Sequence, residues 1–170
     1  MFPCHFDLAK KHNLPLYLHS RACEDDFLKI VKENRNKFDS ACVHSYTGTK
    51  SEMLELVDMG LYIGLNGCSL KTEENVEVVK DIPIDRIMLE TDAPYCEIKN
   101  SSVVKQYVKT KFPAKDKKKF AKGYLVKGRN EPCRIVEVLE AVAAIKEVEV
   151  EELAEIAYEN SVKMFAKEKK

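Results

Sequence analysis

The chain has 170 residues, of which 45% are hydrophobic and 33% charged, a composition typical of a globular domain. The sequence contains no run of about 20 apolar residues, and its first residues lack the apolar centre of a signal peptide. It therefore predicts neither a membrane span nor secretion.

Six cysteines are spread along the chain, and none of them forms a Cys-x-x-Cys pair. This spacing excludes a zinc knuckle and a thioredoxin-type motif. Because no secretory signal is evident, we expect reduced thiols in an intracellular protein.

The first 90 residues alternate amphipathic segments with short apolar runs. Thr49 and Glu52 have the spacing of a capping box, and Gly60 stands where a helix commonly ends. The expected helices are 2–12, 23–34, 49–59 and 73–80, and the expected strands are 14–19, 41–44, 61–65 and 86–90. Four such βα units in succession predict a parallel sheet.

The style of the chain changes after Pro94. Residues 97–130 are polar and rich in lysine, with a short helix expected near 103–108. Two amphipathic helices follow, the first with Asn130 as N-cap and Pro132 in its first turn. The positions expected to be buried in these two helices are Ile135, Val138, Leu139, Val142, Leu153, Ile156, Ala157, Met164 and Phe165.

Three of the predicted strands end in residues that can bind a metal ion. His19 and His44 close the first two strands, and Asp92 follows the fourth. The carboxyl ends of parallel strands meet at one edge of a sheet, which is where α/β barrels keep their chemistry. Imidazole and carboxylate groups converging there suit a divalent ion that activates water, with Asp92 also taking a proton.

Each of these residues has a simpler interpretation as well. A histidine at a strand end is often structural, and an Asp before Ala-Pro can simply shape the turn. Glu90 fits either a proton relay behind the site or a plain salt bridge. Arg21 fits either a grip on phosphate or an ion pair with Glu24 or Asp25.

The basic segment shows a strong charge asymmetry. Lys99 to Arg129 contains eleven Lys or Arg residues and a single acid, Asp116, so the remainder carries 17 basic and 27 acidic residues. Aromatic residues are interleaved with these lysines: Tyr107, Phe112, Phe120 and Tyr124. This pattern favours binding of a nucleic-acid backbone and unstacked bases over a merely solvated surface. The cluster Lys115–Lys119 weakly predicts a nuclear location, with the cytoplasm as the alternative.

The sequence resembles the TatD family of metal-dependent deoxyribonucleases. The resemblance is carried by LPLYLHSR at 14–21, HSYTG at 44–48, ETDAPY at 90–95 and RNEP at 129–132, in order along nearly the whole chain. It implies a distorted (β/α)8 barrel with a divalent metal centre that hydrolyses DNA phosphodiester bonds, including 3′-to-5′ exonuclease action. It also implies that His19, His44 and Asp92 are metal ligands and that Arg21 and Tyr46 flank the substrate.

Two features of the family pattern are absent from this sequence. The first-strand His-x-His pair is missing, since His5 and His12 stand seven residues apart, and so is a Gly-Glu-Ile-Gly-Leu-Asp-like segment. We therefore expect one domain over 1–170 with a basic insert at 97–130. Its fold class would be α/β, the second half of a TIM-barrel-like metal-dependent hydrolase: about four βα units plus C-terminal helices. Half a barrel leaves open edges and an open face, which predicts instability of the isolated chain or self-association through the exposed half-barrel face.

Three hypotheses for function follow. The first is a metal-dependent deoxyribonuclease with DNA as partner and Mg²⁺ as the expected ion, Mn²⁺ or Zn²⁺ being alternatives. The second is a catalytically impaired form that binds and regulates a full-length enzyme. The third, a hydrolase of small amides or esters, has no use for an extended cationic surface.

Overall fold

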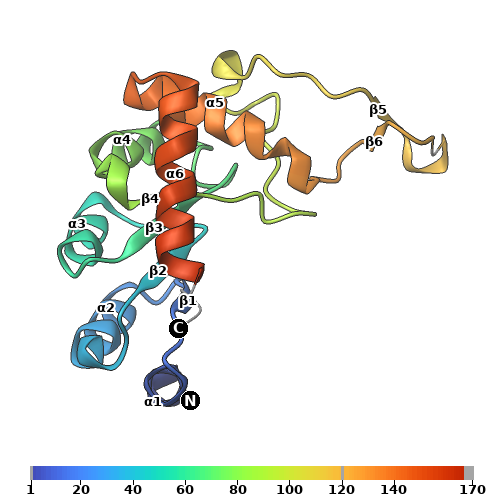
Figure 1. Ribbon diagram of the computed structural model, residues 1–170. Helices are drawn as coiled ribbons and strands as arrows, with labels where there is room; N and C mark the ends of the chain where they lie inside the picture. The colour runs from blue at the N-terminus through green and yellow to red at the C-terminus, as the bar shows by residue number, and fades with distance from the viewer. Residues whose placement is uncertain (1, 120, 167–170) are drawn as a thin grey trace.

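The computed structural model describes residues 2–119 and 121–166, apart from the side chain of Glu24. Its centre is a parallel sheet in the order β1-β2-β3-β4, with helices α2 to α4 along one side (Figure 1). The strands are β1 (Leu16–His19), β2 (Ala41–His44), β3 (Tyr62–Leu65) and β4 (Ile87–Leu89). The helices before and between them are α1 (Phe2–His12), α2 (Glu24–Glu33), α3 (Lys50–Asp58) and α4 (Glu73–Asp81), with short 3-10 helices at Arg35–Lys37 and Ile84–Arg86. The predicted alternation of helix and strand is confirmed.

Local sequence signals set the ends of the helices. The Thr49 hydroxyl accepts a hydrogen bond from the backbone N–H of Glu52 at 3.2 Å, so the predicted cap opens α3. Thr72 caps α4 in the same way by accepting from the N–H of Asn75. Gly60, two residues after α3, has a φ of +80°, a conformation that costs glycine little.

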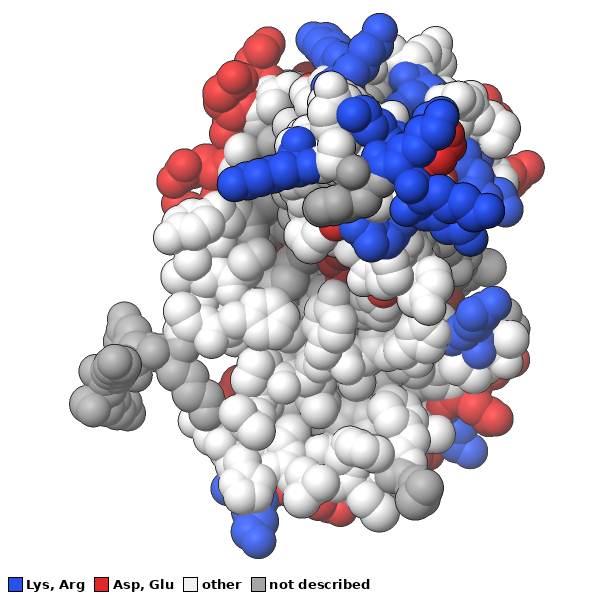
Figure 2. All heavy atoms as spheres, turned by 90° about the vertical axis from the view of Figure 1, so that its right-hand side faces the viewer, with Lys and Arg blue, Asp and Glu red and all other residues white. Residues whose placement is uncertain are grey.

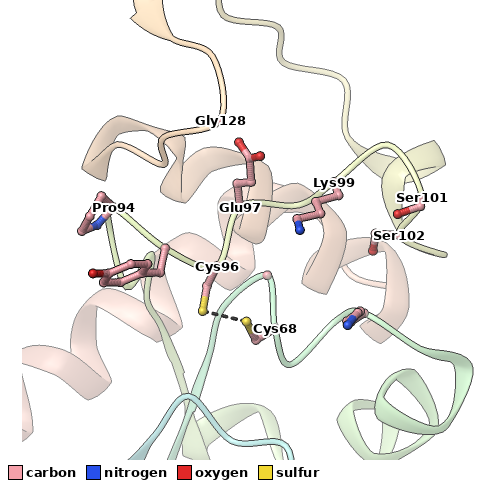
Figure 3. Close-up of a pocket in the computed structure, with 11 residues that line it drawn as sticks. Cys68, Pro94, Cys96, Glu97, Lys99, Ser101, Ser102 and Gly128 are labelled. Atoms are coloured by element: carbon pink, nitrogen blue, oxygen red, sulfur yellow. Dashed lines mark hydrogen bonds between the residues drawn. The ribbon is translucent and has the colours of Figure 1, made fainter. Parts of the chain in front are cut away.

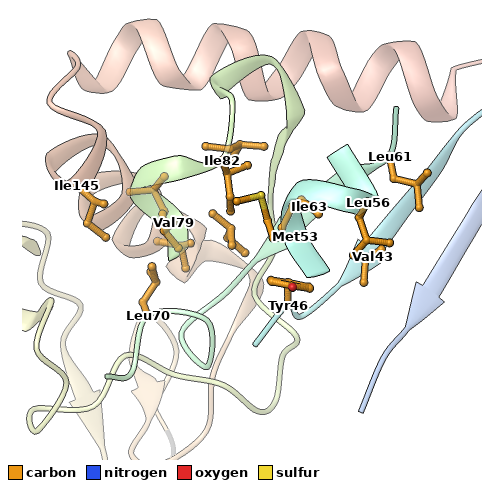
Figure 4. Packing of buried hydrophobic residues seen from close by; sticks show 14 of the residues in the cluster. Val43, Tyr46, Met53, Leu56, Leu61, Ile63, Leu70, Val79, Ile82 and Ile145 are labelled. Carbon is orange, nitrogen blue, oxygen red and sulfur yellow. The ribbon is translucent and has the colours of Figure 1, made fainter. Parts of the chain in front are cut away.

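The main core lies between the sheet and helices α2 to α5 (Figure 4). Side chains alternate between the two faces of a strand, so Val43 and Ile63 point into this core and meet Met53 and Leu56 of α3. The opposite face carries Cys42, Tyr62 and Met88, which form a second, smaller cluster with Met164.

Two helices close the chain, after a 3-10 helix at Pro132–Arg134: α5 (Ile135–Lys146) and α6 (Val150–Phe165). In Figure 1, α6 runs across the sheet, and Met164 near its end covers part of the second face. The second face of the sheet is therefore more covered than we expected for half a barrel. Within the described residues, no helix is long and apolar enough to cross a membrane.

Two of the positions predicted to be buried in these helices are exposed, and two more, Leu139 and Ile156, are only half-buried. Ile135 is 41% exposed because it lies in an open groove between α5 and α6, at the first turn of its helix. Phe165 is 52% exposed because α6 ends at the edge of the sheet, where its ring meets that of Tyr17.

The basic segment divides into two parts. Its beginning belongs to the body of the protein, because Ile98 and Val104 are buried in the main core. The helix expected near 103–108 is only a three-residue 3-10 helix, Lys105–Tyr107. Residues 109–119 and 121–129 project from the body as a long arm (Figure 1), and we call the segment 109–129 the basic arm. It contains the paired strands β5 (Ala114–Lys115) and β6 (Leu125–Val126) and a 3-10 helix at Lys117–Lys119, while Phe120 lies outside the described residues.

The first residues of the basic arm are fixed by one carboxylate of α5. Glu140 accepts hydrogen bonds from the backbone N–H of Lys109 at 2.7 Å and of Thr110 at 3.0 Å, and from the Thr110 hydroxyl at 2.6 Å. Burial acts to raise the pKa of Glu140, but these bonds outweigh it and lower the pKa below its usual value.

We predict that Glu140→Gln loosens the start of the basic arm. Charge-assisted bonds are about twice as strong as neutral ones, so the protection factors of the Lys109 and Thr110 amides should fall about fivefold to tenfold near pH 7. Because the folded pKa is depressed, this protection is present above the unfolded value near 4.5 and is lost as pH falls through the folded pKa. Hydrogen exchange between pH 3 and 7 measures it.

The control variant is Glu151→Gln, on an exposed position of α6. Equal protection in Glu140→Gln, Glu151→Gln and the unmodified protein would show that Glu140 does not hold the arm.

Candidate functional site

The carboxyl ends of β1, β2 and β4 bring the three predicted ligands to one edge of the sheet. His19 and His44 are direct partners in the β1–β2 register, and their ring centroids are 5.5 Å apart. Asp92 follows β4, and its Oδ1 lies 3.6 Å from Nε2 of His44. The sheet thus places residues that are 73 positions apart in the sequence around one small region.

Glu90 organises this region. Its Oε2 accepts hydrogen bonds from Nδ1 of His44 at 2.8 Å and from the backbone N–H of Ser45 at 3.0 Å. The side chain of Glu90 is only 9% exposed. Because the carboxylate accepts a hydrogen bond from Nδ1–H, the other ring nitrogen, Nε2, presents its lone pair on the side where Asp92 lies. Glu90 therefore positions His44 and sets its tautomer.

Gly64 of β3 makes room for this carboxylate. A Cβ atom added at Gly64 would stand 1.9 Å from Oε1 of Glu90, so no other residue fits there with Glu90 in place. Glu90 consequently reaches from the end of β4 across β3 to the histidine of β2. The sequence signal was present, since an isolated glycine in a strand often marks a close approach, but its partner cannot be read from the sequence.

Tyr17 of β1 completes the cluster and was not predicted from sequence. Its hydroxyl donates a hydrogen bond to Oε1 of Glu90 at 2.6 Å. Burial raises the pKa of Tyr17 well above its usual value, and the bond to Glu90 raises it further. The hydroxyl therefore remains a proton donor at neutral pH. The spacing to His19, two residues along the same strand, was the available signal.

Asp92 is held by the turn that leaves β4. Its φ is +53°, a left-handed conformation that aspartate tolerates better than most residues. Its carbonyl accepts from the N–H of Tyr95 at 2.8 Å. The buried side chain of Asn130 donates to the carbonyls of Thr91 at 2.8 Å and Tyr95 at 2.7 Å, closing the turn from the other side.

Asn130 thus has a different role from the predicted one. It is not the N-cap of α5, because that helix begins at Ile135 after a separate 3-10 helix. Its buried side-chain amide instead donates to two carbonyls of the Asp92 turn, those of Thr91 and Tyr95.

The two residues expected beside a substrate are placed differently from each other. Arg21 is exposed in the loop after β1, at the same edge as His19. Tyr46 is 4% exposed and sits in the main core (Figure 4), and its hydroxyl donates to the carbonyl of Thr49 at 2.7 Å. The expected position of Tyr46 beside a substrate stays a prediction, and the structure shows its ring within the main core. The side chain turns inward because its ring packs among the apolar residues of α3.

The donor atoms fit part of a divalent-ion site. Ligands bound at about 2.1 Å in neighbouring positions are about 3.0–3.4 Å apart, and His44 Nε2 and Asp92 Oδ1 come near that separation at 3.6 Å. Within 2–119 and 121–166, no group of three or more His, Cys, Asp or Glu side chains converges closely enough to hold an ion. The pair therefore matches two neighbouring ligand positions, and a full site requires further ligands.

The sequence of this chain is similar to those of known proteins. The family model described as TatD related DNase matches residues 1–166. The deoxyribonuclease Tat-D of Schizosaccharomyces pombe is 46% identical over 163 residues, covering 94% of this chain and 52% of that protein. The deoxyribonuclease Tat-D of Saccharomyces cerevisiae is 34% identical over 200 residues, covering 92% and 48% respectively.

The fold is also similar to that of solved structures. A crystal structure of a hydrolase TatD family protein from Entamoeba histolytica superposes with a TM-score of 0.91 and 32% identity, covering 97% of this chain and 55% of that one. This confirms the predicted α/β, TIM-barrel-like hydrolase fold, although the chain spans about half the length of the curated relatives that it matches. The family match over residues 1–166 and the identity to these relatives establish that the chain belongs to the TatD-related DNase family.

Proposed function

We propose that this chain acts in metal-dependent hydrolysis of DNA phosphodiester bonds, of the exonuclease or endonuclease type. The observation that carries the proposal is the pair formed by His44 Nε2 and Asp92 Oδ1, with Glu90 fixing the imidazole from behind. Relatives named as deoxyribonucleases support the choice of DNA. A relative from Bacillus subtilis that is named as a metal-dependent hydrolase supports a divalent ion. Mg²⁺ is our first choice, ahead of Mn²⁺ and Zn²⁺.

Each residue of the cluster has a distinct role in this proposal. His44 and Asp92 hold the ion, with His19 beside them as a further candidate ligand. The ion, when bound, supplies Lewis-acid activation of water and of the phosphate group. Glu90 and Tyr17 keep the imidazole of His44 in one orientation and one tautomer. Asp92 accepts a proton from the attacking water as the bond between the water oxygen and phosphorus forms.

We predict that Asp92→Asn lowers metal-dependent cleavage at least about 100-fold, because the amide neither carries the charge nor accepts the proton. The measurement is digestion of end-labelled single-stranded DNA with Mg²⁺ or Mn²⁺, together with Mn²⁺ binding by calorimetry. Asp58→Asn, at the exposed end of α3, makes the same chemical change away from the site and should leave both unchanged.

The outcomes separate the hypotheses. Cleavage that is indifferent to Asp92 would contradict the proposed site. DNA binding without cleavage would favour the alternative of a regulatory partner of the full-length enzyme. Hydrolysis of neutral esters but not of DNA would favour the small-substrate hydrolase.

We also infer that the basic arm binds the DNA backbone. Figure 2 shows Lys and Arg side chains gathered over one end of the molecule, above a largely uncharged face. The arm contains nine Lys or Arg residues and only one acid, Asp116. The ammonium group of Lys115 lies 3.9 Å from the ring centroid of Tyr124, so cationic and aromatic groups are adjacent as binding to single strands requires. Nuclear location remains a prediction from the Lys115–Lys119 cluster.

Replacing Lys117, Lys118 and Lys119 with Gln should weaken DNA binding and make it less sensitive to salt. Three lost phosphate contacts lower the slope of log affinity against log salt by about 2 for single strands. Binding is measured by fluorescence anisotropy in the Asp92→Asn background, which prevents cleavage during the titration.

The control carries Lys10, Lys11 and Lys29 changed to Gln, three exposed residues of α1 and α2. This control has the same net charge as the arm variant. Its slope of log affinity against log salt concentration should equal that of the parent protein. Equal losses in both variants would show that overall charge, not the arm, governs binding.

We further propose that the chain self-associates through the β1 edge of the sheet. Among the described residues, β1 has a hydrogen-bonded neighbouring strand on one side only. Leu14, Tyr17 and Phe165 beside it are each about half exposed. The rings of Tyr17 and Phe165 are 6.2 Å apart and form one apolar patch. An unpaired strand edge next to such a patch favours pairing with a second copy.

Phe165→Ser should weaken this association about tenfold or more, because a buried Phe side chain contributes about 1.5–3 kcal/mol. Sedimentation velocity over a range of protein concentrations measures the effect. Tyr124→Ser, an exposed aromatic of the basic arm, is the control. A monomer at every concentration, before any substitution, would contradict the proposal.

A further inference from the structure

Two cysteines, Cys68 and Cys96, lie side by side in loops at the carboxyl edge of the sheet (Figure 3). Cys68 follows β3, and Cys96 follows β4, 28 residues later in the sequence. Their sulfur atoms are 2.7 Å apart. Both residues are free thiols of intermediate burial, and both line a pocket of about 460 Å³.

The backbone holds these two loops together independently of the sulfurs. A Cβ added at Gly67 would stand 2.1 Å from the carbonyl oxygen of Cys96, so the two chains touch at this glycine. The Asn66 side chain accepts from the N–H of Cys68 at 2.9 Å and fixes that loop from inside. Forming a bond between the sulfurs therefore requires little movement of the backbone.

We propose that Cys68 and Cys96 are a reversible disulfide site that links the loops after β3 and β4 beside Asp92. The oxidant is a peroxide. One thiol loses its proton, and the resulting thiolate attacks a peroxide oxygen. The O–O bond breaks, a sulfenic acid forms, and the released hydroxide takes up that proton and leaves as water. The second thiol attacks the sulfenic sulfur and releases another water. In total, two thiols and one hydrogen peroxide give one disulfide and two waters, a two-electron oxidation of the sulfurs.

The disulfide changes the surroundings of Asp92. In the reduced protein, the thiol of Cys96 donates to Oδ2 of Asp92 at 3.3 Å. A disulfide sulfur carries no proton, so this bond is lost and Oδ2 becomes fully available to a cation. This consequence rests on the proposed metal-binding role of Asp92, whereas formation of the disulfide does not.

Peptide mapping tests the disulfide directly. Trypsin places each of the six cysteines on a different peptide, with Cys68 on 51–71 and Cys96 on 87–99. The full chain is treated with hydrogen peroxide, blocked with an alkylating agent, digested and analysed by mass spectrometry. We expect the cross-linked pair 51–71 and 87–99, its disappearance with dithiothreitol, and a melting temperature raised by roughly 5–10 °C in the oxidised form.

Matched variants define the site. Cys68→Ser and Cys96→Ser should each abolish the cross-link and the thermal shift, while Cys133→Ser, at an exposed thiol, should leave both intact. The proposal is overturned if Cys68 and Cys96 stay alkylated while other thiols oxidise. It is also overturned if either cysteine pairs preferentially with Cys4, Cys23 or Cys133.

Mn²⁺ titration of the oxidised and reduced forms tests the link to Asp92. Loss of one hydrogen bond to the carboxylate should lower the Mn²⁺ dissociation constant about twofold or more, in the unmodified protein but not in Cys68→Ser. A mapped disulfide with no change in Mn²⁺ binding would overturn the link to Asp92. A missing cross-link would overturn the disulfide whether or not the protein cleaves DNA.

Discussion

The geometry of the site depends on one buried carboxylate that crosses the sheet. Glu90 leaves the end of β4, passes over Gly64 of β3 and binds His44 of β2 and Tyr17 of β1. A charge buried to this degree is tolerable only when donors surround it, and here four donors do so, the thiol of Cys42 among them. Because these donors come from β1, from β2 and from the residue that follows β2, the carboxylate also fixes how the ends of the strands face one another.

The surroundings of Asp92 follow the same logic of satisfying polar groups with residues distant in sequence. The turn that carries it is closed by Asn130, which stands directly after the basic arm. The other end of the arm is held by Glu140 of α5. The arm is therefore attached to the body at both ends, and one of these ends touches the Asp92 turn. In the proposed function, this connection would let a DNA backbone bound by the arm lysines approach His44 and Asp92.

The same edge of the sheet holds two different kinds of chemistry. Hard donors, His44 and Asp92, face each other at 3.6 Å, while the soft thiols of Cys68 and Cys96 lie on the loops beside them. The thiol of Cys96 contacts Asp92, so the two groups are not independent. Oxidation of the thiols is therefore expected to remove the hydrogen bond from Cys96 to the Asp92 carboxylate.

The sequence alone determined the alternation of helices and strands, the parallel sheet, and the edge at which His19, His44 and Asp92 gather. Hydrophobic periodicity and capping residues are local signals, so Thr49 and Gly60 could be assigned without tertiary information. Only the tertiary structure decided which distant groups meet. In the tertiary structure, the side chain of Tyr46 is buried in the core. The side chain of Asn130 hydrogen-bonds to the Asp92 turn instead of capping a helix. The tertiary structure also placed Glu90 beside Tyr17 and Cys68 beside Cys96. These pairs depend on strand register and on two close approaches, of the Glu90 side chain to Gly64 and of the Cys96 backbone to Gly67, whose partners no local pattern specifies.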